Sequence, residues 1–460
     1  MARRLFARVL DAPGGMRIET IHAFCQSLLR RFPLEAEVAP HFRLIEERDA
    51  AELLSEARET MLRAARAGDN PELAAAFDRA VGRMQESGLD TVLREFLRQR
   101  DRLQRLEMRM GSAEGLRRAM AGLLGIPPDA PARSILREAC ADHALDHAAL
   151  KRAASALMQG GVSDRRRGEV LLEWLALAAE HRAERYDGCK RVYFTQEGAL
   201  LKRLATAAAV KHWPDVAHVL EAEASRLQAV MDRMRAAECL GDSHALTVLA
   251  LDLETRYRKL KAMRAALDYD DLILKARDLL LRPGIAPWVL YKLDGGIDHI
   301  LVDEAQDTNH HQWDLIKALT EEFFSGTGAQ PIGRTVFAVG DRKQSIFSFQ
   351  GAEPAAAAAV RDYYAGKLNK HVEKDPRPAF VDVPLDVSFR STGAVLKLVD
   401  AVIAGPARAG VLEEGASLHH RVSRIGQAGS VELWPRAQPV ALSPPEPWAI
   451  PRVAPGLPAP

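Results

Sequence analysis

The sequence DHILVDEAQDTNHHQWDLIKALTEEFF, residues 298–324, contains the feature that decides the fold. An apolar run at residues 300–302 ends directly in two adjacent acids, Asp303 and Glu304. A short apolar run of this kind is typical of a buried strand. Apolar residues with helical spacing follow at residues 310–324. A strand followed by a helix in this order favours an α/β fold with a mostly parallel sheet.

Two more segments extend the pattern. RTVFAVGD, residues 334–341, and VPLDVSFRS, residues 383–391, each predict a buried strand that ends in polar residues. Ligands of open α/β sheets bind at the carboxyl ends of the strands. We therefore expect a binding site there, formed by Asp303, Glu304, Asp341 and Arg390.

The remaining regions differ from this α/β segment. Residues 16–20 predict a strand and residues 21–32 a helix, whereas residues 46–265 are helical almost throughout. An arginine-rich stretch within the helical region, residues 93–111, predicts mainly solvated helix faces, with a nucleic-acid-binding face as the alternative. Prolines dominate residues 435–460, which favours an extended or disordered tail.

Composition excludes several classes of protein. The 460 residues carry a net charge of +1, so any affinity for nucleic acid must come from local basic patches. No apolar run approaches the roughly 20 residues that span a bilayer. The four cysteines are far apart in the sequence, which argues against a disulfide framework and agrees with a reducing, cytoplasmic location.

The acids after residue 302 suit a divalent cation. Mg²⁺ prefers oxygen ligands, so Asp303 is a candidate metal ligand. Glu304 is a candidate for orienting or deprotonating a water molecule. The alternative is a strand end with solvated acids. The neighbouring His310 and His311 would point in different directions on a helix, and we expect them to be surface residues.

A second motif is VFAVGDRKQSIFSFQGA, residues 336–352. Gly340 allows a sharp exit from the strand, and Asp341 and Gln344 place polar groups at the same sheet edge. Phe347 and Phe349 share a face in extended backbone. They predict either a stacking platform for bases or buried core aromatics.

The third motif is LDVSFRST, residues 385–392. Arg390 precedes a helix whose N-cap is expected at Ser391 or Thr392. Its planar guanidinium can bind a phosphate, and Phe389 can stack on a base. A surface ion pair is the alternative role for a lone arginine.

These motifs, in this order, resemble the UvrD/Rep-like superfamily of DNA helicases. LVDEAQDT resembles the Mg²⁺-and-water motif of the family, VGDRKQSIFSFQGA its glutamine motif and LDVSFRST its arginine motif. TIHAFC, residues 20–25, resembles a DNA-contact motif, and LDYDDLI, residues 267–273, a segment found before the Mg²⁺ motif. Within the superfamily, the AddA subunits of AddAB helicase-nucleases are most similar, although typical superfamily members have arginine where this chain has Gln350.

The resemblance implies roles for individual residues. Asp303 would coordinate Mg²⁺, Glu304 would be the catalytic base, Gln344 would couple the γ-phosphate of ATP to DNA, and Arg390 would be an arginine finger. Asp341 and Phe389 would complete the nucleotide site. Contacts to DNA are implied for Thr20, His22, Phe24, Phe347, Phe349 and Gln350.

The resemblance also implies an incomplete RecA-like P-loop NTPase motor with a large all-α insertion. The first motor domain would comprise residues 1–45 and 266–352, the insertion residues 46–265, and the start of a second motor domain residues 353–434. The expected function is an ATP-dependent 3′–5′ DNA helicase of double-strand-break repair and recombination. Its expected ligands are ATP, Mg²⁺, and single-stranded and duplex DNA, and its expected partner is an AddB-like subunit.

One motif of such a motor is missing from the 460 residues. A P-loop requires Gly-x-x-x-x-Gly-Lys-Ser/Thr, but the Gly366-Lys367 pair is followed by Leu368, and Arg361 stands at the position of the first glycine. We therefore expect a central fragment of a longer protein that hydrolyses ATP negligibly by itself. A non-catalytic DNA-binding or subunit-binding fragment is the main alternative. An unrelated Mg²⁺-dependent phosphohydrolase built on Asp303, Glu304 and Asp341 is a further one.

Overall fold

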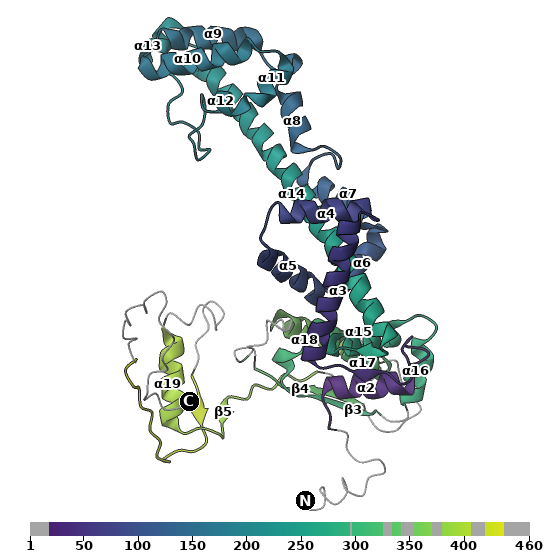
Figure 1. Ribbon diagram of the computed structural model, residues 1–460. Helices are drawn as coiled ribbons and strands as arrows, with labels where there is room; N and C mark the ends of the chain where they lie inside the picture. The colour runs from purple at the N-terminus through teal and green to yellow at the C-terminus, as the bar shows by residue number, and fades with distance from the viewer. Residues whose placement is uncertain are drawn as a thin grey trace, which may run out of the picture. The chain divides into compact units, whose positions relative to one another are not determined.

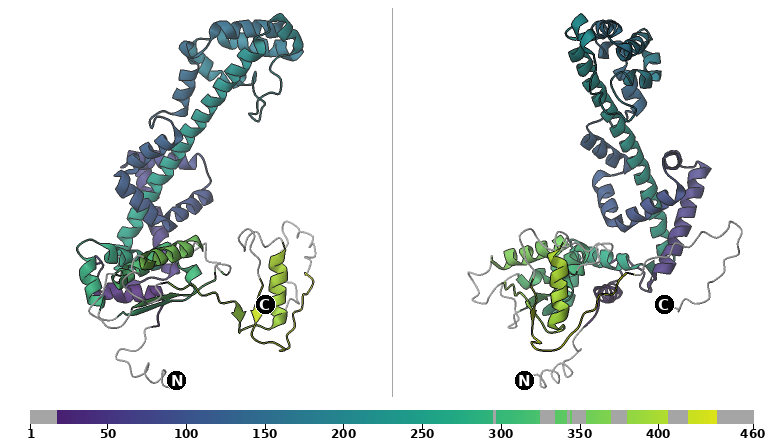
Figure 2. Two further views of the ribbon diagram at one scale, coloured as in Figure 1. Left: turned by 180° about the vertical axis from the view of Figure 1, so that it is seen from behind. Right: turned by 90° about the vertical axis from the view of Figure 1, so that its left-hand side faces the viewer.

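The chain is helix-rich and contains a few short parallel strands (Figures 1 and 2). The computed structural model describes residues 18–294, 297–324, 334–341, 344, 354–369, 380–405 and 419–436. The chain divides into two compact units, Met1–Tyr291 and Lys292–Pro460. Among the described residues, no helix is both long and apolar enough to cross a membrane.

Unit 1 begins with helix α2, Ile21–Arg31, as the apolar spacing predicts. Thr20 is the N-cap of this helix, since its hydroxyl accepts a hydrogen bond from the Ala23 N–H at 3.2 Å. Its buried face consists of Cys25, Leu28 and Leu29. The predicted strand at residues 16–20 is wrong for residues 18–20, because these residues lead into the helix cap instead.

The helical region is organised along one helix of 48 residues, α14, Val216–Met263. Figure 1 shows the other helices of the region arranged along its length. These are α3 (Glu47–Ala67), α4 (Pro71–Val81), α5 (Glu86–Arg98), α6 (Arg100–Met110), α7 (Ala113–Leu124), α8 (Ala132–Ala139), α9 (His147–Met158), α10 (Val162–Leu175), α11 (Ala179–Glu184), α12 (Tyr186–Lys190) and α13 (Ala207–His212), with a 3₁₀ turn, η1, at Asp142–Ala144.

Three hydrophobic clusters lie along α14, and α14 contributes buried residues to each of them. Leu249 belongs to the cluster with α3 and α4, Leu240 to the cluster with α7 and α8, and Leu220 to the cluster with α9 and α10. A helix that packs against neighbours on several faces cannot keep one apolar stripe. The length of α14 therefore rests on tertiary packing along its whole course.

A short parallel strand pair joins the two ends of the helical region. Strand β1, Arg43–Leu44, precedes α3, and strand β2, Ala266–Leu267, follows α14. The two strands pair in parallel, with Arg43 opposite Ala266. Helix α15, Tyr269–Leu281, follows β2 and packs against α2. The long helical excursion therefore starts and ends at the same place in unit 1.

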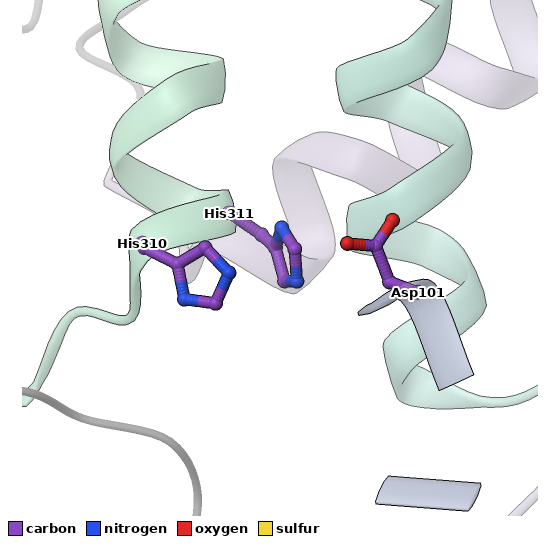
Figure 3. A group of neighbouring side chains, drawn as sticks. All are labelled: Asp101, His310 and His311. Carbon is purple, nitrogen blue, oxygen red and sulfur yellow. The ribbon is translucent and has the colours of Figure 1, made fainter. Parts of the chain in front are cut away.

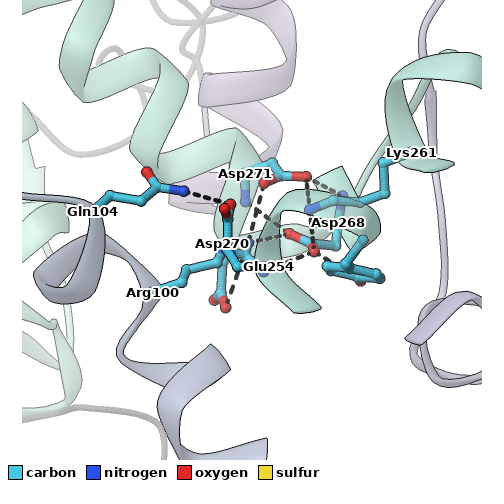
Figure 4. A network of polar contacts seen from close by, with 8 residues as sticks. Arg100, Gln104, Glu254, Lys261, Asp268, Asp270 and Asp271 are labelled. Atoms are coloured by element: carbon cyan, nitrogen blue, oxygen red, sulfur yellow. Dashed lines mark hydrogen bonds and ion pairs between the residues drawn. The ribbon is translucent and has the colours of Figure 1, made fainter. Parts of the chain in front are cut away.

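A buried network of charged groups connects α6, α14 and α15 (Figure 4). The Asp268 carboxylate accepts two hydrogen bonds from the Arg100 guanidinium, at 2.6 and 3.0 Å, and one from the Lys261 ammonium at 2.8 Å. Tyr257 donates a further hydrogen bond to it at 3.1 Å. Asp271 also accepts from Arg100, at 3.1 Å, and its backbone N–H donates to Asp268 in a capping box.

Arg100 corrects the interpretation of the arginine-rich stretch. Arg94 and Arg105 lie on solvated faces and pair with acids of their own helices, as predicted. Arg100 stands in the same stretch but its residue surface is only 7% exposed. Local sequence does not distinguish it, because its partners Asp268 and Asp271 are 168 and 171 residues away.

Unit 2 contains the strands predicted to carry the site. Helix α16, Ala286–Asp294, crosses the division between the units. The other elements are β3 (His299–Val302), η2 (Ala305–Asp307), α17 (His310–Thr320), η3 (Glu321–Phe324), β4 (Thr335–Ala338), α18 (Pro354–Asn369), β5 (Val387–Ser388), α19 (Gly393–Ala404) and β6 (Arg421–Val422).

The strands of unit 2 pair in parallel, as the alternation of strands and helices predicts. β3 pairs with β4 from His299 opposite Thr335 to Val302 opposite Ala338. β5 and β6 form a separate two-residue pair. The predicted strand at residues 383–391 is shorter than expected, since only two of its residues join a ladder. The prediction that the strands are buried is wrong for most of β3 and β4, where Leu301 is 74% and Phe337 57% exposed.

Candidate functional site

The candidate site lies where β3 and β4 end side by side. The ladder continues one step beyond the strands, since Val339 N–H donates to the Val302 carbonyl and Ala305 N–H donates to the Val339 carbonyl, both at 2.9 Å. Asp303 and Glu304 follow β3 within this ladder, and Asp341 follows β4. The structure therefore brings together two motifs that are almost 40 residues apart in the sequence.

Glu304 adopts a backbone conformation that is uncommon for a residue with a side chain. Its φ is 50° and its ψ is 46°, in the left-handed region that costs energy for residues other than glycine. The Asp303 carboxylate accepts the Glu304 N–H at 3.0 Å and holds this turn. Both acidic residues are exposed. Two solvent-facing carboxylates at a strand end fit a hard cation that keeps several water ligands, as Mg²⁺ does.

Gln306 is a residue of the site that the sequence interpretation did not assign. Its side chain is buried and lies between the two strand ends. The amide nitrogen donates to the Glu304 carboxylate at 2.6 Å, and the amide oxygen accepts the Asp341 N–H at 3.0 Å. The signal in the sequence was a polar residue two positions after the second acid, but only the structure shows what it faces.

Gly340 also makes room for a neighbouring side chain. A Cβ atom at this position would lie 2.4 Å from the Gln306 amide oxygen and 3.1 Å from the Ala305 backbone nitrogen. Real Cβ atoms do not approach other atoms as closely as 2.4 Å. The glycine therefore leaves the space that the Gln306 side chain occupies.

Gln344 joins the same group of residues through Asp341. Its side-chain amide donates to the Asp341 carboxylate at 3.0 Å, and its backbone N–H donates to the Asp341 carbonyl at 2.9 Å. Gln344 itself is exposed. Gln344, the proposed coupling residue, thus belongs to a turn that is hydrogen-bonded through Asp341 to Gln306.

Arg390 and Phe389 are placed elsewhere in unit 2. They follow β5, both are exposed, and the Arg424 guanidinium donates to the Phe389 carbonyl at 2.9 Å. Thr392 stands at the N-cap position of α19, one of the two positions predicted. Within the described part of the chain, no hydrogen bond or ion pair joins Arg390 to Asp303 or Glu304.

The predicted DNA-contact residues of unit 1 lie on or next to α2. The Thr20 hydroxyl caps the helix, and Phe24 is half-buried. The His22 ring meets the Tyr269 ring edge-on, with centroids 5.4 Å apart. Burial lowers the pKa of His22, and the negative charge of Asp270 opposes this shift. The structure thus links the TIHAFC and LDYDDLI motifs through one ring contact.

Three of the predicted DNA-contact residues, Phe347, Phe349 and Gln350, lie outside the described residues. The choice between a stacking platform and core aromatics therefore stays a prediction for both phenylalanines.

The two histidines at the start of α17 are not arranged as predicted. The His310 and His311 rings lie against each other, with centroids 3.8 Å apart and planes inclined at 45° (Figure 3). Both are half-buried rather than fully exposed. Asp101, also drawn in Figure 3, belongs to α6, where its carboxylate accepts from Arg277 at 2.8 Å. The expectation that the neighbouring rings diverge is therefore wrong.

Comparison with known proteins agrees with the motifs. Residues 1–365 match the family described as UvrD/REP helicase N-terminal domain. The chain is 28% identical over 152 residues to an ATP-dependent helicase/nuclease component of Natranaerobius thermophilus, which covers 33% of this chain and 10% of that protein. It is 33% identical over 138 residues to the ATP-dependent DNA helicase Rep of Escherichia coli, covering 30% of this chain and 17% of Rep.

A third relative is similar to a segment of about the same length. The ATP-dependent DNA helicase PcrA of Staphylococcus aureus is 29% identical over 147 residues, covering 32% of this chain and 17% of that protein. The aligned segments thus span less than a fifth of each of these relatives. The match to the family over most of the chain confirms the resemblance that the motifs indicate.

Proposed function

The chain belongs to the UvrD/REP helicase family, and we propose from this premise that it is part of an ATP-dependent 3′–5′ DNA helicase motor. The motor would act in double-strand-break repair and recombination. One observation carries the proposal: two polar motifs meet at the ends of the parallel strands β3 and β4. This is the edge of an α/β sheet where nucleotide ligands bind.

In the proposed motor, Asp303 holds Mg²⁺ and Glu304 orients or deprotonates the attacking water. Bound by Asp303, Mg²⁺ would supply positive charge that stabilises the charge developing during phosphoryl transfer. Gln344 and Asp341 form the neighbouring turn that senses the terminal phosphate. Phe389 contacts the nucleotide, and Arg390 serves as the arginine finger from a second motor domain. The fold proposed around these residues is RecA-like, with the helices α3–α14 as an insertion.

Thr20, His22, Phe24, Phe347, Phe349 and Gln350 are the residues we propose to contact single-stranded DNA. The relatives named as components of a helicase/nuclease support a motor that works with a second chain, which we propose to be AddB-like. We place this assembly in the cytoplasm, on duplex and single-stranded DNA.

The 460-residue chain is expected to hydrolyse ATP negligibly by itself, with or without DNA. The lysine and backbone N–H groups of a P-loop hold the β- and γ-phosphates, and the 460 residues contain no such motif. A coupled assay for ADP release on the purified chain would measure this, with Glu304→Gln as the control for contaminating activity. DNA-stimulated turnover that disappears in Glu304→Gln would contradict the expected inactivity and would assign the activity to this site.

A second candidate function is a non-catalytic DNA-binding fragment of the same assembly. The missing P-loop favours this candidate for the chain as it stands. It predicts that the chain binds single-stranded DNA without ATP and that Phe349→Ala weakens this binding, since base stacking on an aromatic side chain contributes roughly 1–3 kcal/mol.

Fluorescence anisotropy with a labelled oligonucleotide at fixed salt would measure the affinity. Phe380→Ala, at a phenylalanine outside the motif that is 36% exposed, is the control and should leave the affinity unchanged. Equal affinities for the wild type and Phe349→Ala would remove the phenylalanine from the DNA path. A complete lack of DNA binding by the folded chain would argue against the DNA-binding function itself.

A further inference from the structure

Gln306 connects the two motifs of the candidate site. The side chain donates from its nitrogen to the Glu304 carboxylate at 2.6 Å and accepts the Asp341 N–H with its oxygen at 3.0 Å. A carboxylate accepts only and a backbone N–H donates only, so these two partners determine the orientation of the amide. The residue is 3% exposed, whereas both acids of the motif are exposed. A buried amide therefore holds a carboxylate that faces solvent.

The surrounding backbone leaves this amide little freedom. The ladder bonds from Val339 to Val302 and from Ala305 to Val339 fix the separation of the two strand ends. The left-handed turn at Glu304 leads the chain back so that its carboxylate reaches Gln306. The absence of a side chain at Gly340 leaves room for the amide oxygen. Three independent features of the backbone thus converge on one side chain.

The contacts extend from Gln306 to the proposed coupling residue. Asp341, whose N–H donates to Gln306, also accepts the side-chain amide of Gln344 at 3.0 Å. A continuous path of hydrogen bonds therefore runs from Glu304 through Gln306 and Asp341 to Gln344. A displacement of the turn that carries Gln344 would therefore also move the Glu304 carboxylate, because these hydrogen bonds connect the two.

We propose that Gln306 is a positioning residue that holds the Glu304 carboxylate at a fixed distance from the Asp341–Gln344 turn. This inference rests on the proposed function, in which Glu304 acts on the water that attacks ATP. An exposed glutamate side chain otherwise loses rotamer entropy each time it is ordered. A Glu304 side chain that Gln306 already orders before the substrate binds is in a productive geometry for the reaction.

The charge of the contact gives a direct test. Gln306→Glu has the same shape and keeps an acceptor for the Asp341 N–H, but it places a second carboxylate against Glu304. At neutral pH the two negative charges repel each other.

Hydrogen exchange of the Asp341 amide reports this contact without any need for ATP turnover. We expect exchange in Gln306→Glu to be at least about tenfold faster than in the wild type at neutral pH, because repulsion from the Glu304 carboxylate displaces the side chain of residue 306 from the Asp341 N–H that it accepts. The matched control is Gln228→Glu, where a half-buried glutamine donates to Asp232 on α14. It should not change exchange at Asp341.

The reciprocal double variant separates positioning from a merely structural role. In Gln306→Glu with Glu304→Gln, the donor and the acceptor exchange places, and the amide of residue 304 can donate to the carboxylate of residue 306. We expect this pair to restore slow exchange at neutral pH. Fast exchange that persists in the double variant would show that Gln306 only fills space, and would overturn the proposal.

A measurement on the wild type covers the case in which Gln306→Glu does not fold. The side-chain amide N–H signals of Gln306, identified by NMR of glutamine-labelled protein, should exchange slowly with solvent in the wild type. They should exchange faster in Glu304→Ala, which removes the acceptor of this amide at an exposed residue. An amide that does not respond to Glu304 would contradict the proposal. Loss of DNA binding, in contrast, would argue against the proposed function and leave these signals unaffected.

Discussion

Replacing Asp268 with alanine is expected to lower the free energy of unfolding of unit 1 by about 3–5 kcal/mol, because the change breaks a buried ion-pair network by removing one partner. Arg100 and Lys261 are 7% and 4% exposed, and each donates to this carboxylate. Without it, the two buried cations would share the half-buried Asp271, and Arg100 would keep only the exposed Asp270 as a further acid partner. Unit-resolved hydrogen exchange across α14 and α15, with urea denaturation, would measure the loss.

Two variants separate the possible sources of the loss. Asp268→Asn keeps an acceptor for the Asp271 N–H, which Asp268 caps at 2.8 Å. Asp268→Asn should still lower the free energy of unfolding almost as much as Asp268→Ala does, since the cap that it keeps contributes only about 1 kcal/mol. Asp232→Ala removes an exposed acid that pairs with Arg235 and should cost less than about 1 kcal/mol. Equal losses for Asp268→Ala and Asp232→Ala would contradict the importance of the buried network.

The same network predicts how stability depends on pH. Burial by itself would raise the pKa of Asp268, but Arg100 and Lys261 outweigh burial and lower the pKa well below its usual range. A carboxyl group with a lowered pKa in the folded state contributes stability above its unfolded pKa of roughly 3.9. This contribution is lost as the pH falls from there toward the folded pKa. The difference in stability between the wild type and Asp268→Ala should therefore shrink on acidification below about pH 4.

Replacing Trp313 with alanine is expected to lower the free energy of unfolding in unit 2 by about 3–5 kcal/mol. Trp313 is 2% exposed and is among the largest fully buried side chains of the described chain. Helix α17, which contains it, begins just after the acidic motif and is held by a capping box between Asn309 and Gln312. Loss of the indole should therefore also increase exchange at the amides of η2 and β3.

Trp434→Ala is the matched control, because this tryptophan is 81% exposed and its loss should change stability by less than about 0.5 kcal/mol. Trp313→Phe should cost much less than Trp313→Ala. The indole N–H has no hydrogen-bond partner among the described residues, so Trp313→Ala removes buried apolar volume rather than a polar contact. If Trp313→Phe were as harmful as Trp313→Ala, a polar role for the indole would have to be assumed.

Much of the local structure could be predicted from the sequence. The apolar spacing of residues 21–32 predicts α2, and the alternation of strands and helices predicts the parallel pairing of β3 with β4. The acids at the two strand ends were predicted to be neighbours because parallel strands end at the same sheet edge. Pairing partners far apart along the chain are the part that local patterns cannot supply.

Gln306, Gly340 and Arg100 show where this limit lies. Each looks ordinary in its own segment: a polar residue after two acids, a glycine after a strand, and an arginine among many. Their roles depend on atoms from distant segments, namely the Asp341 N–H, the Gln306 amide oxygen and the Asp268 carboxylate. The structure likewise placed His310 against His311, where local geometry predicts that the rings diverge.

The sequence by itself determined the family, the order of the motifs and the residue types available for chemistry, because these depend only on spacing along the chain. The tertiary structure alone decided which polar groups meet. It joined Glu304 to the Asp341–Gln344 turn through Gln306 and buried Arg100 against Asp268. The physical reason is that hydrogen bonds and ion pairs require atoms within about 3 Å of each other, and only the folded chain sets the distances between segments far apart in the sequence.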